Sequence, residues 1–248
     1  VKKIENQPIK LDNYKIRNGL ATLSNDIYFF NPVGEDDVFF YREYDGELYP
    51  IEKSICIDVI KPNIIRKEAD IEKCKQKAIF PYGRDRVIIS EECMEIDYPM
   101  AYKFLLKNKE KLLKRDKGKA SEYIAWYAYG RTQGMVNQGK KLLIPYMAEK
   151  GIAVKSLDEN MLFYCGYAIF CDDNEQMEVL KILIESDVFL FYIKNTSKPY
   201  SKGYMALAKN YIKNFGIPRL DEQQKRKLLI LRGNERQVFI KSLYGIDI

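Results

Sequence analysis

The segment from Met161 to Phe170, MLFYCGYAIF, is the feature that most restricts the fold of this 248-residue chain. It is almost continuously apolar, a pattern typical of a strand that is buried on both faces of a sheet. The next segment, Glu175–Asn195, has helical periodicity and is apolar nearly all round from Val188 to Ile193. We therefore expect a core that contains one fully buried strand and one buried helix.

The first 96 residues contain short apolar and aromatic runs between turn residues, a pattern that predicts a mainly β part of the fold. Ile27–Phe30 is expected to be a strand, and so is Ile55–Ile65, which Pro62 interrupts. Phe39–Lys53 is expected to be a hairpin, because Asp45-Gly46 suits the positive φ angles of a two-residue turn.

Helical periodicity becomes clear from Tyr98 onward. Asp97 is expected to cap this helix, with Pro99 in its first turn. Apolar residues repeat on one side of the helix, at Ala101, Phe104, Leu105 and Leu112. The opposite side carries a lysine stripe, which consists of Lys103, Lys107, Lys111 and Lys114. Such a helix can pack on a sheet with one side and face phosphate groups with the other.

The remaining third of the chain mixes strands with helices. Leu142–Tyr146 is expected to be a strand, and Tyr204–Asn214 a helix that ends before Gly216 and Pro218. Asp221 begins a further helix with a capping box, and a last helix is expected at Asn234–Leu243. We therefore predict a mixed α+β fold, β-rich in its N-terminal half, with helices and a few strands in its C-terminal half. The expected divisions are residues 1–96, 97–220 and 221–248.

The chain contains no histidine, which excludes Ser-His-Asp and Cys-His nucleophilic sites and every metal site that needs histidine. Its five cysteines form no Cys-x-x-Cys pair, so we expect free thiols in a reducing cytoplasm. No apolar run reaches about 18 residues, and the N-terminus lacks a signal-peptide pattern. We expect no membrane segment.

Motifs for catalysis and cofactor binding are also missing. A methyltransferase needs a glycine-rich turn after a strand, and an amino-methylating one needs an Asn-Pro-Pro-Tyr type of loop. The sequence has only Asn31-Pro32-Val33, which we interpret as a strand end. It contains no Walker motif and no Glu-x-Lys of the metal-dependent nucleases. We therefore expect a binding chain without a catalytic residue, metal or cofactor of its own.

The net charge of +6 is modest, but the basic residues are concentrated in two segments. Tyr98–Lys141 has eleven Lys and Arg against three acidic residues, and Lys194–Arg219 has six basic residues and no acidic ones. The rest of the chain is therefore acidic overall. This segregation indicates a surface that binds a polyanion. The alternative is that each segment forms an ordinary solvated helix face.

Ser121–Lys141 combines an aromatic cluster with a sequence that carries hydrogen-bonding side chains between two glycines. Its aromatic residues are Tyr123, Trp126, Tyr127 and Tyr129, and its polar ones are Arg131, Thr132 and Gln133. Aromatic faces stack on bases, while Arg and Gln form bidentate contacts with base edges. The alternative is a buried aromatic patch beside a glycine-rich turn.

Six motifs that occur in order, between about residues 10 and 218, carry a resemblance to a known family. They are KIRNGLATLSNDIYFF (Lys15–Phe30), KAIFPY (Lys77–Tyr82), YPMAYKFLLKNKEKLLKRD (Tyr98–Asp116), WYAYGRTQG (Trp126–Gly134), KLLIPYMA (Lys141–Ala148), and Tyr192–Tyr204 followed by IKNFGIP (Ile212–Pro218). The chain resembles the C-terminal target recognition domain of adenine-specific (N6) DNA methyltransferases of the TaqI-like and type IIG restriction-modification class. The part after Arg219 departs from this family.

The resemblance implies that the chain binds double-stranded DNA and recognises its base sequence. A separate N-terminal methyltransferase domain of the same polypeptide, which binds S-adenosylmethionine, would flip out and methylate an adenine. The chain begins at Val1 with a sequence like the middle of a protein, so we expect it to be part of a longer one. Whether that bacterial protein also cleaves DNA is left open.

Within this hypothesis the candidate residues fall into two groups. Phosphate contacts are expected from Lys103, Lys107, Lys111, Lys114, Lys198, Lys202, Lys209 and Lys213. Base or backbone reading is expected from Thr22, Arg131, Thr132, Gln133, Ser197 and Tyr200. Trp126 and Tyr127 are expected to pack and hold the loop.

Three alternatives remain. In the first alternative, Arg131 is a structural arginine that pairs with a buried carboxylate. In the second alternative, the whole chain is a non-catalytic protein-interaction module or a subunit of a larger complex. The least favoured alternative is a standalone enzyme.

Overall fold

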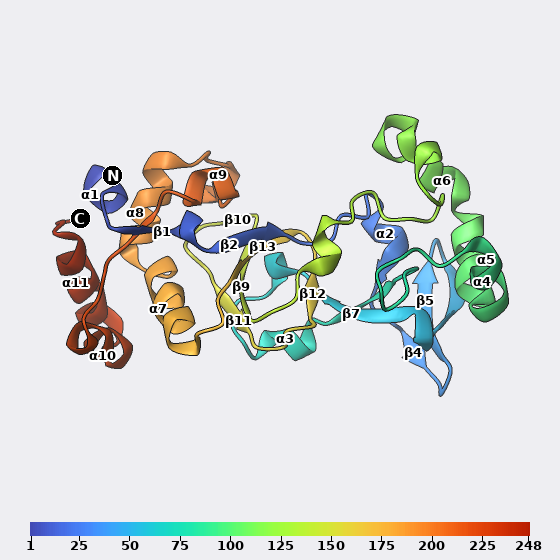
Figure 1. Ribbon diagram of the computed structural model, residues 1–248, viewed down its shortest axis with the longest axis horizontal. Coiled ribbons are helices and arrows are strands. Elements are labelled where there is room, and N and C mark those ends of the chain that lie inside the picture. Colours follow the sequence, from blue (N-terminus) through green and yellow to red (C-terminus); the bar gives the residue numbers. More distant parts are fainter.

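The computed structural model describes residues 1–248 and is elongated along one axis (Figure 1). Both termini lie at one end, beside the last two helices, and a β hairpin with its covering helices forms the other end. Helices and strands both contribute substantially, which confirms the predicted α+β class. No helix has the length and apolar character that crossing a membrane requires.

The first core surrounds a four-stranded antiparallel sheet in the middle of the molecule. The strand order is β11 (Val154–Ser156), β9 (Lys141–Pro145), β13 (Gly166–Phe170) and β2 (Lys15–Asn18). The strand predicted at Leu142–Tyr146 is β9, to within one residue at each end. All five residues of β9 are buried.

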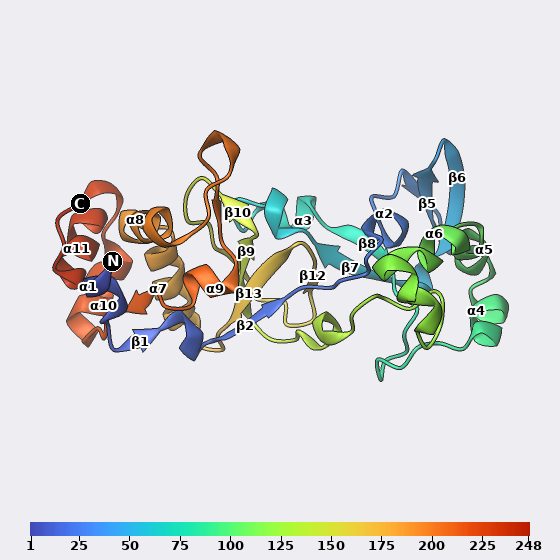
Figure 2. The ribbon, with the colours of Figure 1, turned by 90° about the horizontal axis from the view of Figure 1, so that it is seen from above.

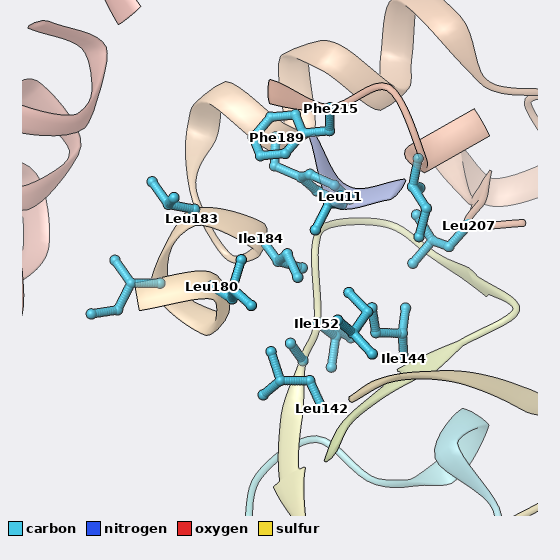
Figure 3. Packing of buried hydrophobic residues seen from close by; sticks show 14 of the residues in the cluster. Leu11, Leu142, Ile144, Ile152, Leu180, Leu183, Ile184, Phe189, Leu207 and Phe215 are labelled. Atoms are coloured by element: carbon cyan, nitrogen blue, oxygen red, sulfur yellow. The ribbon is translucent and has the colours of Figure 1, made fainter. Parts of the chain in front are cut away.

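Helices fill the molecule from this sheet to the end that carries the termini. They are α1 (Lys2–Glu5), α7 (Asn174–Ile184), α8 (Asp187–Thr196), α9 (Lys209–Ile212), α10 (Glu222–Ile230) and α11 (Gly233–Tyr244). Figure 3 shows Leu180 and Ile184 of α7 beside Leu142 and Ile144 of β9. The predicted capping box at Asp221 is present in α10, and α11 confirms the last predicted helix.

The helix predicted at Glu175–Asn195 is in fact two helices. The helix is interrupted between α7 and α8, where the Ser186 hydroxyl accepts a hydrogen bond from the Phe189 amide at 3.2 Å. Ser186 followed by Asp187 is a helix-start signal, and it overrides the continuous apolar periodicity. The break turns α8 so that Phe189 packs on Phe215, with ring centroids 4.9 Å apart.

The predicted continuous strand Met161–Phe170 is also divided. β12 (Leu162–Phe163) pairs in parallel with β7 (Cys56–Ile60), whereas β13 belongs to the first core. Between them Cys165 has a positive φ of 51°. The segment is apolar throughout because both cores use it: Met161 and Phe163 belong to the first core, and Leu162 and Tyr164 to the second. The backbone turns sharply at Cys165, before β13.

The second core lies toward the other end of the molecule. Its sheet has the order β12, β7, β8 (Gln76–Ile79) and β3 (Phe29–Phe30), and a second sheet consists of β4 (Gly34–Glu35), β5 (Phe39–Tyr44) and β6 (Glu47–Glu52). The β5–β6 hairpin confirms the prediction, with positive φ at both Asp45 and Gly46. Of the strand predicted at Ile55–Ile65, only β7 is a strand, and the part that begins at Pro62 is a short 3-10 helix. The two cores draw residues from both sides of position 97.

Ile27–Phe30 is mostly not a strand, because α2 (Asn25–Tyr28) precedes the short β3. The guanidinium of Arg42 donates hydrogen bonds to the carbonyls of Asp26 and Ile27, at 2.8 and 2.5 Å. Arg42 is buried and comes from the neighbouring hairpin. A tertiary contact therefore stabilises a helical turn where local propensity favours a strand.

Helices α4 (Glu91–Asp97), α5 (Pro99–Lys107) and α6 (Lys109–Leu113) cover the hairpin. The four residues predicted to be apolar contacts, Ala101, Phe104, Leu105 and Leu112, are all fully buried. Asp97 does not cap α5, because it is the last residue of α4. Glu52, the last residue of β6, caps α5 instead, and its carboxylate accepts hydrogen bonds from the Met100 and Ala101 amides at 2.7 and 2.8 Å.

Short elements complete the chain. The paired strands are β1 (Ile9–Lys10) with β15 (Gly216–Ile217), and β10 (Met147–Ala148) with β14 (Met205–Ala206). The helix predicted at Tyr204–Asn214 is wrong in its first half, because Met205 and Ala206 pair with β10 and leave only α9. The other short helices are α3 (Asp70–Lys73), η1 (Leu11–Asn13), η2 (Lys53–Ile55), η3 (Pro62–Ile64), η4 (Arg115–Glu122), η5 (Gln133–Val136) and η6 (Ser201–Gly203).

Candidate DNA interface

A hollow of about 540 Å³ lies where β2, η5 and α9 meet. The helical turns that follow α6 rise from the same side of the molecule as α9, with β2 and β13 between them (Figure 1). The hollow is lined by Ile16, Arg17, Asn18, Gly19, Ala21, Arg131, Gln133, Gly134, Tyr146 and Lys209. It therefore brings together three of the predicted residues, Arg131, Gln133 and Lys209.

Strand β2 contributes two polar side chains that the sequence-based site did not include. It is an edge strand, with β13 on one side only, and it alternates a buried Ile16 with an exposed Arg17. Neither the Arg17 guanidinium nor the Asn18 side-chain amide forms a hydrogen bond or ion pair within the chain. The period-two pattern of Lys-Ile-Arg-Asn was the signal that identifies Arg17 as outward-facing.

The backbone of η5 passes very close to the end of β2, where Gly134 lies against Gly19. A Cβ atom on Gly134 would lie 2.5 Å from the carbonyl oxygen of Gly19, and one on Gly19 would lie 2.2 Å from that of Phe163. Only residues without a Cβ permit this approach. The crossing sets Gln133 next to Asn18 at the hollow.

Hydrogen bonds fix this crossing on either side of the glycines. The Arg131 amide donates to the Ala21 carbonyl at 3.0 Å, and the Gly130 amide donates to that of Thr22 at 3.3 Å. Beyond η5, the side-chain amide of the buried Asn137 donates to the Asn18 carbonyl at 2.5 Å. The segment that carries Arg131 and Gln133 is thus tied to β2 along its length.

Arg115 is the buried residue that organises the loop before this crossing. Its guanidinium donates to the carbonyls of Leu112, Thr22, Ala128 and Trp126, at 2.8 to 2.9 Å. These carbonyls come from three separate segments of the chain. A single cation therefore holds together backbone that no regular secondary structure satisfies.

Arg131 lies at the surface and pairs with Asp116, with Nη1 and Oδ2 3.0 Å apart. This hydrogen bond is the largest contribution that lowers the pKa of Asp116 and raises that of Arg131. Asp116, Lys117 and Gly118 all have positive φ, so the backbone turns tightly and carries the carboxylate to Arg131. Because the arginine side chain is about half exposed, the pair is a surface ion pair.

The aromatic cluster of Ser121–Lys141 belongs to the second core. Trp126, Tyr127 and Tyr129 are buried, so the packing predicted for the first two is confirmed. The indole N–H of Trp126 donates to Glu91 at 2.8 Å, and the Tyr127 hydroxyl donates to the Ile89 carbonyl at 2.6 Å. These rings do not present faces for stacking, whereas Arg131, Thr132 and Gln133 are exposed.

Thr22 is fully buried. Its hydroxyl donates to the Asn25 side-chain oxygen at 2.7 Å and accepts from the Ser24 amide at 3.0 Å. These bonds stabilise the turn before α2. The structure therefore gives Thr22 a structural role and leaves its side chain no access to a ligand.

Ser197 and Tyr200 lie apart from the hollow, on a loop that projects from the body between α8 and β14 (Figure 2). The loop closes through a bridge between Pro199 and Met205, and the Ser197 hydroxyl donates to the Ala206 carbonyl at the base. Tyr200 is 45% exposed near the tip. The loop also carries the exposed Lys198 and Lys202.

The eight lysines predicted to bind phosphate divide into two sets. Four pair with carboxylates: Lys107 with Glu47 at 2.7 Å, Lys111 with Asp26 at 2.5 Å, Lys114 with Glu110 at 2.6 Å and Lys209 with Asp12 at 3.1 Å. The other four, Lys103, Lys198, Lys202 and Lys213, form no ion pair within the chain. Exposed ion pairs are weak, so even the paired lysines remain able to exchange their partner for another anion.

Metal ligands do not gather anywhere in the chain, since no group of three or more Cys, Asp or Glu side chains is placed to hold an ion. All five cysteines are free. Burial raises the pKa of the Cys56 thiol to about 12, which opposes thiolate chemistry there.

Comparison with known proteins relates the chain to restriction-modification enzymes. It is 28% identical over 136 residues to the type II restriction enzyme and methyltransferase RM.Eco57I of Escherichia coli. The matched region is 49% of this chain and 13% of that enzyme. No protein-family model matches the chain.

The fold is that of part of the type IIL restriction-modification enzyme MmeI, whose structure was solved in complex with DNA. The TM-score is 0.60 at 11% sequence identity, over 94% of this chain and 33% of MmeI. The type IIG restriction endonuclease BpuSI gives a TM-score of 0.47 at 14% identity, over 99% of this chain and 27% of BpuSI. The chain thus spans a minor part of each relative.

Proposed function

We propose that this chain is the target recognition domain of a restriction-modification adenine-N6 DNA methyltransferase, and that it binds duplex DNA in a sequence-specific manner. The observation that carries the proposal is the hollow at β2 and η5. It gathers Arg17, Asn18, Arg131 and Gln133, and three of these four side chains have no partner within the chain. Arg, Asn and Gln are the side chains that read base edges bidentately.

Features outside the hollow support the same function. Lysines lie elsewhere on the surface, on α5 and α6 toward one end of the molecule and on the projecting Ser197–Tyr204 loop. Lysine contacts to phosphate supply affinity without sequence preference, whereas groove contacts supply the preference. The similarity to RM.Eco57I, described as a restriction enzyme and methyltransferase, supports a place in such a system.

Methyl transfer belongs to another part of the proposed protein. An N-terminal domain of the same polypeptide would bind S-adenosylmethionine and act on an adenine that has been flipped out of the duplex. The present chain would hold the duplex and set which adenine is presented. We propose a bacterial cytoplasmic protein for this role.

A binding titration tests the proposal. The 248-residue chain is mixed with a labelled random-sequence duplex at low salt, and its affinity is then measured at increasing salt concentrations. We expect binding, with a logarithmic affinity that falls linearly with the logarithm of salt concentration. Enrichment of bound duplexes from a randomised library should then yield a defined site. A folded chain that binds no duplex would contradict the proposal.

A second candidate function, docking of a protein partner, has one observation in its favour. Between β6 and α5 lies another hollow of about 540 Å³, and Leu48, Met100 and Leu106 remain exposed around it. Such a groove suits an apolar side chain of a partner. If Leu48→Glu abolished association with a partner and left DNA binding intact, both functions would be present on separate surfaces.

A further inference from the structure

Arg17 differs from every other cation at the hollow in having no anionic partner. Arg131 is paired with Asp116, and Lys209 with Asp12. The guanidinium of Arg17 keeps all its donors free. An exposed arginine with unused donors inside a hollow is available for a ligand.

The position of Arg17 is also well defined. Its backbone pairs with Ala168 in the register of β2 and β13. The preceding Ile16 is 2% exposed and anchors the strand in the first core, and Gly19 fixes its end against Phe163. Because the strand is rigid, binding needs to order only the rotamers of the side chain and not the backbone that carries it.

The charge of the hollow favours a neutral base edge over a phosphate. Asp116 and Asp12 neutralise two of the three cations, and their carboxylates repel a phosphate that comes close. The remaining groups beside Arg17 are the uncharged amides of Asn18 and Gln133. A guanidinium matches guanine O6 and N7, and a side-chain amide matches adenine N6 and N7.

We propose that Arg17 is a specificity-determining residue that reads a guanine, with Asn18 and Gln133 beside it placed to read an adjacent adenine. The inference rests on the proposed function, because it concerns the DNA that the chain would bind. It differs from that function in naming one residue and one base.

Site selection with variants tests this assignment. The full 248-residue chain and its Arg17→Ala, Arg17→Gln and Lys15→Ala variants each select duplexes from a randomised library. Lys15 is a matched control, because it lies on the same strand and the same face but outside the hollow, with its ammonium 4.9 Å from the Phe170 ring centroid. Thermal unfolding of each protein verifies that the fold is retained.

We expect the unmodified chain to select a site with at least one fixed guanine. Arg17→Ala should relax that position alone and weaken binding to the selected site by about 5- to 150-fold, with a much smaller effect on random duplex. Arg17→Gln should favour adenine at the same position. Lys15→Ala should leave the selected sequence unchanged.

Three results would overturn the assignment, and they separate it from the proposed function. If Arg17→Ala selects the same site, Arg17 does not read a base. If it weakens selected and random duplexes equally, Arg17 contacts phosphate. If the unmodified chain binds duplex DNA but selects no site, the base-reading role fails while DNA binding stands. Absence of any binding by the folded, unmodified chain would refute the proposed function itself.

Discussion

Three arginines near the hollow have different roles because their surroundings differ. Arg115 is buried under four carbonyls, Arg131 is paired at the surface, and Arg17 is exposed without a partner. Their side chains are chemically identical, so residue type alone does not separate them. The first stabilises the fold, and the other two are available for ligands.

Replacing Arg115 is therefore expected to destabilise the protein. Arg115→Ala removes a donor from four carbonyls, leaves those of Trp126 and Ala128 with none, and should lower the free energy of unfolding by about 3–4 kcal/mol. Denaturant unfolding measures this loss. Arg131→Ala is the control, and its effect on stability should be much smaller because its ion pair is exposed. Equal losses in the two variants would contradict the structural role of Arg115.

Lys141 predicts a pH effect on stability. It is fully buried, and this burial lowers the pKa of its ammonium from 10.5 to about 8. Between pH 8 and about 10 the unfolded chain therefore holds a proton that the folded chain has released, so this residue's contribution to stability rises with pH. The ammonium donates to the carbonyls of Asp158, Glu159 and Met161.

The Lys141→Met variant isolates this contribution. Unfolding free energies of both proteins are measured at pH 7, 8, 9 and 10. Other groups titrate in both proteins, so the difference between the two curves reflects Lys141. We expect the stability of the unmodified chain to rise relative to the variant above pH 8. A constant difference across this range would show that the ammonium keeps its ordinary pKa.

At the level of elements, the crossing of η5 over β2 builds the hollow. The crossing needs glycine at position 134, because a Cβ atom there would lie 2.5 Å from the Gly19 carbonyl oxygen, and Gly19 itself needs to be glycine to approach Phe163. Its hydrogen bonds join segments that are more than 100 residues apart in sequence. Neither element forms the hollow alone.

Gly134→Ala tests the crossing. The added methyl group would lie 2.5 Å from the Gly19 carbonyl oxygen, so the backbone must shift, at a cost of about 1–3 kcal/mol. The shift should also move Gln133 and weaken site-specific DNA binding. Gly34→Ala is the matched control, since its Cβ would meet only the Tyr41 ring, at 4.0 Å. If the two variants unfold and bind alike, the close approach is not required.

At the level of the whole molecule, the basic residues that are concentrated in two segments of the sequence fall into two sets, those paired within the chain and those without a partner. Part of the basic segment that begins at Tyr98 pairs with acidic residues of the N-terminal β part, such as Lys107 with Glu47 and Lys111 with Asp26. These pairs help to align α5 and α6 on the hairpin. The lysines of the projecting loop have no such partners and are free to interact with an external polyanion.

This difference predicts unequal effects on DNA binding. Lys202→Ala should reduce the slope of log affinity against log salt by about 0.9 in magnitude, the value for one lost phosphate contact. Lys107→Ala should change it less, because the ammonium already has Glu47 as its counterion. Titrations with random duplex at several salt concentrations measure both slopes. A larger change for Lys107→Ala would reverse the assignment of the two surfaces.

Features that depend on near neighbours could be predicted from the amino-acid sequence. The Asp45-Gly46 hairpin, the buried face of α5 and α6, strand β9 and the capping box at Asp221 all follow from turn chemistry and periodicity. The absence of histidine limits the chemistry of the chain in whatever way it folds. Signals from turns and periodicity act within a few residues, and distant parts of the chain do not change them.

Only the tertiary structure decided which residues meet. Long-range pairing divided the apolar segment Met161–Phe170 between two sheets, because each half pairs with a different strand. The tertiary structure buried Thr22 and brought Arg17 to the hollow beside Gln133, which follows it by more than 100 positions. Pairing, burial and backbone crossings are set by contacts between distant segments, and no local pattern records those contacts.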